Sequence, residues 1–164
     1  MTRPNEPDGA EHGKPMVLIL CTGNSCRSQM AEAFLRQYQG DRFAVRSAGT
    51  KPAEAVHPLA VRVMGEIGID LSAAVPTRLR DFLGRLPVRH LVIVCDQAGE
   101  SCPRIWPGAV TRHLLPFDDP AEAEGTEEQQ LAVFRRVRDE IETAMKAYDP
   151  KQPEGDMIAA EAIS

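Results

Sequence analysis

Apolar residues along the chain form two kinds of pattern, continuous runs and helical repeats. Residues 16–20 and 91–94 are uninterrupted apolar runs, which are typical of strands buried on both faces. Residues 42–48 alternate between apolar and polar side chains before a glycine, and residues 110–115 are interpreted as a further short strand. The pattern therefore predicts four strands.

Four other segments place apolar side chains at helical spacing. Pro58 suits the first turn of the second of these helices, and Thr126 forms a capping box with Gln129 at the start of the last. Between the third and fourth strands, residues 96–109 contain two glycines and two prolines, which predicts a long loop. The predicted helices cover residues 28–40, 58–68, 77–86 and 126–148.

The order of these elements predicts an α/β fold. Strands alternating with helices give three layers, in which helices flank a central, four-stranded and mostly parallel sheet. Such sheets bind ligands at the carboxyl ends of their strands. Because Cys21, Cys95 and the segment after Leu115 all follow strands, we expect them to meet in one crevice.

Composition is that of one globular domain, with 43% hydrophobic and 26% charged residues in 164. We assign the domain to residues 16–148, a flexible extension to residues 1–15 and a tail to residues 149–164. The extension lacks the apolar segment of a secretory signal, which favours a cytoplasmic protein. A net charge of −5 with scattered basic residues argues against nucleic acid, and no apolar run approaches the roughly 20 residues of a membrane span.

The strongest chemical signal lies where the first strand meets the first helix. Backbone N–H groups of such a turn can surround a tetrahedral oxyanion, and Arg27 adds a bidentate fork. The same positive field favours the thiolate of Cys21, which makes this residue the candidate nucleophile. The predicted oxyanion loop consists of Thr22, Gly23, Asn24, Ser25, Cys26, Arg27 and Ser28.

Ser28 and the aspartates after the fourth strand each allow two interpretations, and Asn24 is expected to have a supporting role. Ser28 could donate its hydroxyl to Cys21 or cap the helix, and the two roles are compatible. Asn24 is expected to hold the loop by bonds from its side chain to the backbone. The pair Asp118-Asp119 follows the fourth strand, where a carboxyl group could serve as a general acid for a leaving oxygen, although two aspartates before Pro120 are also ordinary loop chemistry.

Cys95 and Cys102 leave three alternatives open: core thiols, half of a zinc site, or a redox pair. Zinc ligands are usually separated by two to four residues, and the six residues between Cys95 and Cys102 fit this spacing poorly. The intervening residues 96–101 are polar and contain a glycine, so they could reshape to bring the sulfurs together. A disulfide requires the two Cα atoms to lie within about 7 Å.

Four motifs taken together resemble the thioredoxin-coupled arsenate reductases, a family that shares the low-molecular-weight tyrosine phosphatase fold. The resemblance covers about residues 16–147. The motifs are CTGNSCRSQMAE over residues 21–32, Ser47-Ala48-Gly49, the pair Cys95 and Cys102-Pro103 with six residues between the cysteines, and Phe117-Asp118-Asp119-Pro120-Ala121.

The resemblance implies a thiol relay that reduces arsenate to arsenite. Cys21 attacks arsenate, whose oxygens are held by Arg27 and the loop, and Asp119 protonates the departing hydroxide. Cys95 then attacks the Cys21 sulfur and releases arsenite, and Cys102 moves the disulfide to the Cys95–Cys102 pair. Thioredoxin is implied as the reductant, and phosphate and sulfate as competing oxyanions. Cys26 has no required step.

Members of this family can carry a potassium site at positions that match Asn24, Glu32 and Ser47, together with an acidic residue further on. In this chain, residues 72–77 supply no acidic side chain. The resemblance therefore implies at most a weak monovalent cation site. We expect no tightly bound cofactor and no other metal site.

Two further functions compete with the reductase. A low-molecular-weight tyrosine phosphatase would use Cys21 and its loop but neither later cysteine. Against it, Ala121 stands where these phosphatases usually have an aromatic residue, and Gln29 replaces their usual proline. The third hypothesis, an arsenic- or metal-responsive binder without catalysis, has no DNA-binding helix pair or basic face to support it.

Overall fold

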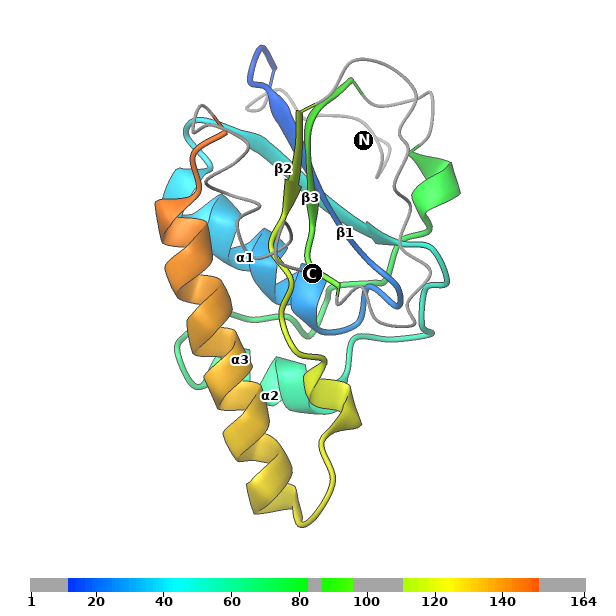
Figure 1. Ribbon diagram of the computed structural model, residues 1–164, viewed down its shortest axis with the longest axis vertical. Coiled ribbons are helices and arrows are strands. Elements are labelled where there is room, and N and C mark those ends of the chain that lie inside the picture. Colours follow the sequence, from blue (N-terminus) through cyan, green and yellow to red (C-terminus); the bar gives the residue numbers. More distant parts are fainter. Residues whose placement is uncertain (1–11, 83–86, 96–110, 151–164) are drawn as a thin grey trace.

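The computed structural model describes residues 12–82, 87–95 and 111–150 (Figure 1). Predictions about the terminal segments before residue 12 and after residue 150, the loop 96–109 and Cys102 lie outside these residues. The elements are β1 (Met16–Cys21), α1 (Arg27–Gln39), β2 (Ala44–Gly49), α2 (Pro58–Gly65), the 3-10 helix η1 (Leu79–Asp81), β3 (Val88–Ile93), β4 (Thr111–Leu114), the 3-10 helix η2 (Pro120–Glu122) and α3 (Glu127–Ala147).

The four strands form one sheet in the order β2-β1-β3-β4, and all three pairings are parallel. This confirms the predicted four-stranded sheet. Every residue of β1 is buried, as its continuous apolar sequence predicts for a central strand. The sheet therefore delivers Cys21, the last residue of β1, to its carboxyl edge.

Helices α1 and α3 pack against each other and cover one face of the sheet, and η1 lies on the other side (Figure 1). The apolar stripe of α3 is buried as its sequence pattern predicts, and the capping box of Thr126 with Gln129 is present at its start. Helix α2 packs against α3. Within the described ranges, no helix has the length and apolar character needed to cross a membrane.

The helix predicted over residues 77–86 is wrong in its described part, which holds only the single turn η1. The reason is that the backbone before η1 pairs with β2. The carbonyl of Thr77 accepts a bond of 2.8 Å from the N–H of Gly49, and Arg78 forms a parallel bridge with Gly49. Backbone groups used in this pairing are not free to begin a helix.

Strand β3 begins at Val88, three residues before the predicted apolar run, because its polar first half also pairs with its neighbours. Its register against β1 is irregular: Met16 pairs with Val88, but Val17 pairs with His90. Arg89 is therefore an extra residue in β3, as in a β-bulge.

Candidate active site

The loop between β1 and α1 is anchored from outside through its carbonyl groups. Four backbone N–H groups of residues 50–57 donate to four of these carbonyls. A loop whose carbonyls are bonded on the outside turns its N–H groups inward, which creates a positive centre suited to an anion. The bonds run from Thr50 to Cys21 (3.4 Å), Lys51 to Thr22 (3.0 Å), Ala53 to Gly23 (2.9 Å) and His57 to Ser25 (2.9 Å).

The Cys21 thiol is buried in the loop between two polar groups. The N–H of Asn24 donates to its Sγ at 3.2 Å, and the hydroxyl of Ser28 lies 2.9 Å away. Ser28 belongs to α1, whose N-cap is Cys26 without a side-chain cap bond. The contact between Ser28 and Cys21 is therefore present and the capping role is not. The Cys21 sulfur therefore has a backbone N–H donor and a hydroxyl group within hydrogen-bond distance.

Asn24 connects the loop to distant segments. It has a left-handed backbone with φ of 51° and a side chain that is completely buried. Its Oδ1 accepts bonds from the N–H of Thr77 (2.8 Å) and from Gln29 Nε2 (3.1 Å). Its Nδ2 donates to Ser28 Oγ (2.7 Å) and Ser47 Oγ (2.9 Å). The predicted loop-holding role thus extends beyond the local backbone.

Gly49 closes the packing on the outer side of the loop. A Cβ atom at this position would collide with the carbonyl oxygen of Thr22 and come within 3.0 Å of the backbone nitrogen of Asn24. Only glycine allows β2 to approach the loop this closely.

Arg27 joins the loop to the segment after β4. The residue is 3% exposed, and its guanidinium donates to the carbonyl of Phe117 at 3.1 Å and lies 3.6 Å from Asp119 Oδ2. Asp118 is exposed and pairs instead with Arg136 of α3 at 3.1 Å. Of the two adjacent aspartates, Asp119 is the one that faces the loop, and the segment after β4 meets the loop that begins at Cys21 through Arg27.

The other cysteines differ from Cys21 in position and state. Cys95 is buried just after β3, the strand that pairs with β1, and the N–H of Val94 donates to the carbonyl of Leu20 at 3.0 Å. Cys95 is disulfide-bonded, whereas Cys21 and Cys26 are free. Burial raises the pKa of the Cys26 thiol to about 12, so it remains protonated at neutral pH.

His57 is a neighbour of the site that the sequence patterns did not indicate as functional. It caps α2, with Nδ1 accepting the N–H of Leu59 at 3.1 Å, and its ring lies 4.9 Å from that of Phe134. Burial lowers the pKa of His57, and the charge of Asp119 opposes this shift. The sequence His57-Pro58 does not by itself indicate that this histidine lies beside the catalytic loop.

The residues expected to form the weak cation site are close together, but they satisfy one another. Ser47 Oγ donates to Glu32 Oε1 at 2.6 Å and accepts the Asn24 amide. Arg36 pairs with the other oxygen of Glu32 at 3.1 Å. Burial raises the pKa of Glu32, while Arg36 and Ser47 oppose the shift. In this structure the oxygens of these groups are therefore engaged by one another and by Arg36.

A buried thiol in an anion-binding loop, with an arginine and an aspartate beside it at the carboxyl edge of a parallel sheet, defines a cysteine-dependent enzyme that handles tetrahedral oxyanions. Residues 16–153 match the low molecular weight phosphotyrosine protein phosphatase family. The arsenate reductase of Bacillus subtilis strain 168 is 45% identical over 134 residues, which are 81% of this chain and 94% of that protein.

Solved structures agree with this match. An arsenate reductase in the phosphate binding state has a TM-score of 0.63 and 30% identity over 81% of this chain and 95% of its own. The thioredoxin-dependent arsenate reductase of Corynebacterium glutamicum has a TM-score of 0.55 and 30% identity over 83% of this chain and 64% of its own. The chain belongs to the low molecular weight phosphotyrosine protein phosphatase family and, within it, to the arsenate reductases.

Proposed function

We propose that this enzyme reduces arsenate to arsenite through a relay of Cys21, Cys95 and Cys102. The observation that carries the proposal is the position of Cys21, a buried thiol at the centre of a loop anchored by its carbonyls, on the strand beside the one that leads to Cys95. The arsenate reductase relatives support arsenate as the substrate.

The loop binds the oxyanion and Cys21 attacks its arsenic atom. Inward N–H groups and the guanidinium of Arg27 hold the arsenate oxygens and offset the charge that develops on them. The N–H of Asn24 donates to the Cys21 sulfur, and the Ser28 hydroxyl lies beside it, so both hold the sulfur in place before attack. Asp119, held beside Arg27, protonates the hydroxide that leaves as the sulfur–arsenic bond forms.

The two-electron reduction follows from thiol exchange. The Cys95 thiolate attacks the Cys21 sulfur, the sulfur–arsenic bond breaks, and its electron pair leaves with arsenic as arsenite. Cys102 then attacks Cys95 and frees Cys21. After this second transfer, the relay predicts a disulfide at Cys95 that does not involve Cys21. Cys95 is disulfide-bonded and Cys21 is free, which supports the proposal.

Thioredoxin is the proposed reductant of the final disulfide, and phosphate and sulfate are the proposed competing oxyanions. The relative described as thioredoxin-dependent supports the first, and the relative described in a phosphate binding state supports the second. The match to the phosphatase family favours a second, weaker activity, hydrolysis of small phosphate esters by Cys21, Arg27 and Asp119.

The relay is tested with Cys102→Ser. This variant should reduce one arsenate per enzyme and then stop as a Cys21–Cys95 disulfide, which mass mapping can identify. Hydrolysis of a small phosphate ester should be largely retained, because it uses neither Cys95 nor Cys102. Steady-state arsenate reduction at the normal rate, with thioredoxin and its reductase present, would refute the relay.

We also propose that activity does not require potassium, since Glu32 already has Ser47 and Arg36 as partners. Replacing potassium by tetramethylammonium at constant ionic strength should leave arsenate reduction unchanged. A loss of activity that potassium alone restores would show that the cation site forms.

A further inference from the structure

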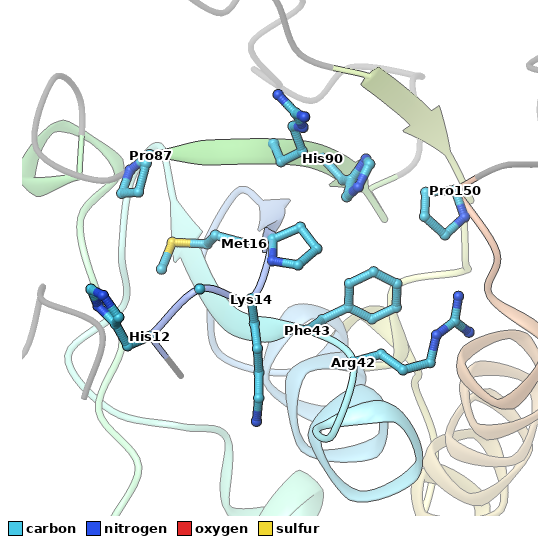
Figure 2. Close-up of a pocket in the computed structure, with 11 residues that line it drawn as sticks. His12, Lys14, Met16, Arg42, Phe43, Pro87, His90 and Pro150 are labelled. Carbon is cyan, nitrogen blue, oxygen red and sulfur yellow. The ribbon is translucent and has the colours of Figure 1, made fainter. Parts of the chain in front are cut away.

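A second pocket lies at the amino end of the sheet, opposite the catalytic loop. It has a volume of about 900 Å³, within the range of small-molecule sites. Its walls come from the segment before β1, from Arg42 and Phe43 just before β2, from the start of β3 and from Pro150 after α3, as Figure 2 shows. Met16, the first residue of β1, lies in its wall, while Cys21 ends the same strand at the catalytic loop.

The lining of this pocket is basic in a protein whose net charge is −5. Lys14, Arg42 and Arg89 contribute permanent positive charges, His12 and His90 add two imidazoles, and none of the described lining residues is acidic. Clustering of one charge in a concave site strengthens the local field and attracts ligands of the opposite charge.

These cations also lack the carboxylate partners that other basic side chains of the protein have. Among the described residues, no ion pair involves Lys14, Arg42 or Arg89. Lys14 donates to the carbonyl of Gly40 at 2.9 Å and Arg42 to the amide oxygen of Gln39 at 2.7 Å, both of which are neutral. By contrast, carboxylates pair with Arg36, Arg62, Arg135, Arg136 and Arg138.

The start of β3 adds a polar group that is not satisfied. Arg89 is the extra residue of the β-bulge, and both it and the next residue, His90, line the pocket. Within the described part of the chain, the buried Nδ1 of His90 has no hydrogen-bond partner. A buried polar atom without a partner is costly, so the amino end of the sheet is not fully satisfied by its own described residues.

Apolar side chains form the rest of the wall. The ring of Phe43 meets that of His90 edge to face at 6.1 Å, and the Arg42 guanidinium lies 5.0 Å above the Phe43 ring. Met16 and three prolines complete this surface. The pocket therefore combines basic groups for an anion with an apolar surface for a planar or hydrophobic moiety.

We propose that this pocket binds a phosphorylated small molecule with a planar or apolar moiety, such as a nucleotide, separately from the catalytic loop. The phosphate groups contact Lys14, Arg42 and Arg89, and the planar moiety packs against the prolines of the wall, Pro15, Pro87 and Pro150, because Met16 and Phe43 are almost completely buried behind them. An inorganic oxyanion would use only half of this surface. The proposal does not depend on the thiol relay.

The test is titration of the full chain with ATP, without magnesium, followed by NMR of the His90 ring and the Met16 methyl group. Both signals should shift and saturate. Arg89→Glu should weaken the affinity by about ten-fold or more, because a charge-assisted contact is replaced by repulsion. Arg42→Gln is a second variant that should weaken binding without reversing a charge. Reductase activity in the absence of ATP should not change in Arg89→Glu.

Arg62→Glu is the matched control, since it makes the same charge change on α2, away from the pocket. The proposal is overturned if it weakens ATP binding as much as Arg89→Glu, or if ATP shifts only the amides of Gly23 and Asn24 in the catalytic loop. Pyrophosphate binding as tightly as ATP would overturn the role of the apolar surface. Adenosine binding as tightly as ATP would overturn the role of the basic groups.

Discussion

The two ends of β1 satisfy their polar and charged groups in different ways. At the carboxyl end, Cys21 has two polar neighbours, Asn24 uses both ends of its amide, and Arg27 is held by a carbonyl and a carboxylate. At the amino end, Lys14 and Arg42 donate to neutral oxygens, no ion pair of theirs is found among the described residues, and the strand register is irregular. One end is organised by the chain itself, whereas the other would be completed by a ligand.

This difference is instructive because the two ends face different energetic demands. Catalysis gains most from donors that are fixed before the substrate arrives, since they need no reorganisation in the transition state. The segment 50–57 fixes the loop carbonyls from outside for this purpose. A binding pocket can retain unpaired cations, because the ligand supplies the opposite charge when it binds.

The largest effect is expected from Cys21→Ser, because a serine hydroxyl is not ionised at neutral pH and cannot replace the thiolate. Arsenate-dependent NADPH oxidation coupled to thioredoxin and its reductase should fall to background. Cys26→Ser, the matched control, should retain activity, since the Cys26 thiol has a pKa of about 12 and takes no step in the relay. Comparable activity of both variants would remove Cys21 from the mechanism.

The next largest effect should separate the adjacent aspartates. Asp119→Asn removes the proton donor beside Arg27 and should slow the chemical step by roughly 10²–10⁴-fold. Asp118→Asn alters only an exposed pair with Arg136 and should have little effect. Single-turnover rates with excess enzyme give the comparison directly, and the reverse order would assign the acid to Asp118.

Backbone packing at the carboxyl end of β1 can be tested by replacing each of two glycines with alanine in separate variants. Gly49→Ala forces a Cβ into Thr22 and should lower the free energy of unfolding by roughly 1–3 kcal/mol. Gly65→Ala adds a Cβ at the end of α2 where it meets nothing, and should raise stability by about 0.5–1 kcal/mol. Urea unfolding of both variants measures the contrast, and two changes of the same sign would contradict it.

The smallest effect is expected at the amino end and depends on pH. Burial, reinforced by the charges of His113 and Arg89, lowers the pKa of His90 from 6.5 to about 4. As the pH falls from 6.5 towards 4, the unfolded chain takes up a proton at His90 that the folded protein does not, so stability decreases. His90→Gln should therefore lose less stability than the wild type over this range.

Urea unfolding at pH 7 and pH 4.5 for both proteins provides the measurement. Equal losses in the two proteins would mean that His90 is not held neutral by its surroundings. Addition of saturating ATP sharpens the comparison, because an anion beside His90 should reduce the loss in the wild type and leave the variant unchanged.

Local sequence signals were sufficient for the sheet and the chemical centre. The apolar run 16–20 and the glycine, cysteine and arginine that follow it determine a strand, a tight loop and a helix start within a dozen residues. The capping box at Thr126 is likewise a local feature and is present. The helix predicted over 77–86 failed because its first residues pair with Gly49, which is distant in sequence.

The remaining features of the site depend on contacts between distant segments. The residues alone do not distinguish the two adjacent aspartates, and the family resemblance selects Asp119. The fold directs Asp119 to Arg27 and Asp118 to α3. The support of the loop by residues 50–57 uses backbone groups, which leave no residue-specific pattern. The bulge at Arg89 depends on the register between β1 and β3. The pattern of apolar residues sets the register of a strand, but the first residues of β3 include polar side chains and provide no such pattern.

The complete burial of β1 has a consequence for hydrogen exchange. The strand is about 20 Å long, pairs on both sides and connects the catalytic loop to the second pocket. Local opening would break two ladders at once, so we expect its amides to exchange with solvent only when the whole domain unfolds. Deuterium uptake along Met16–Cys21 would then report the global free energy of unfolding, whichever end of the strand is altered.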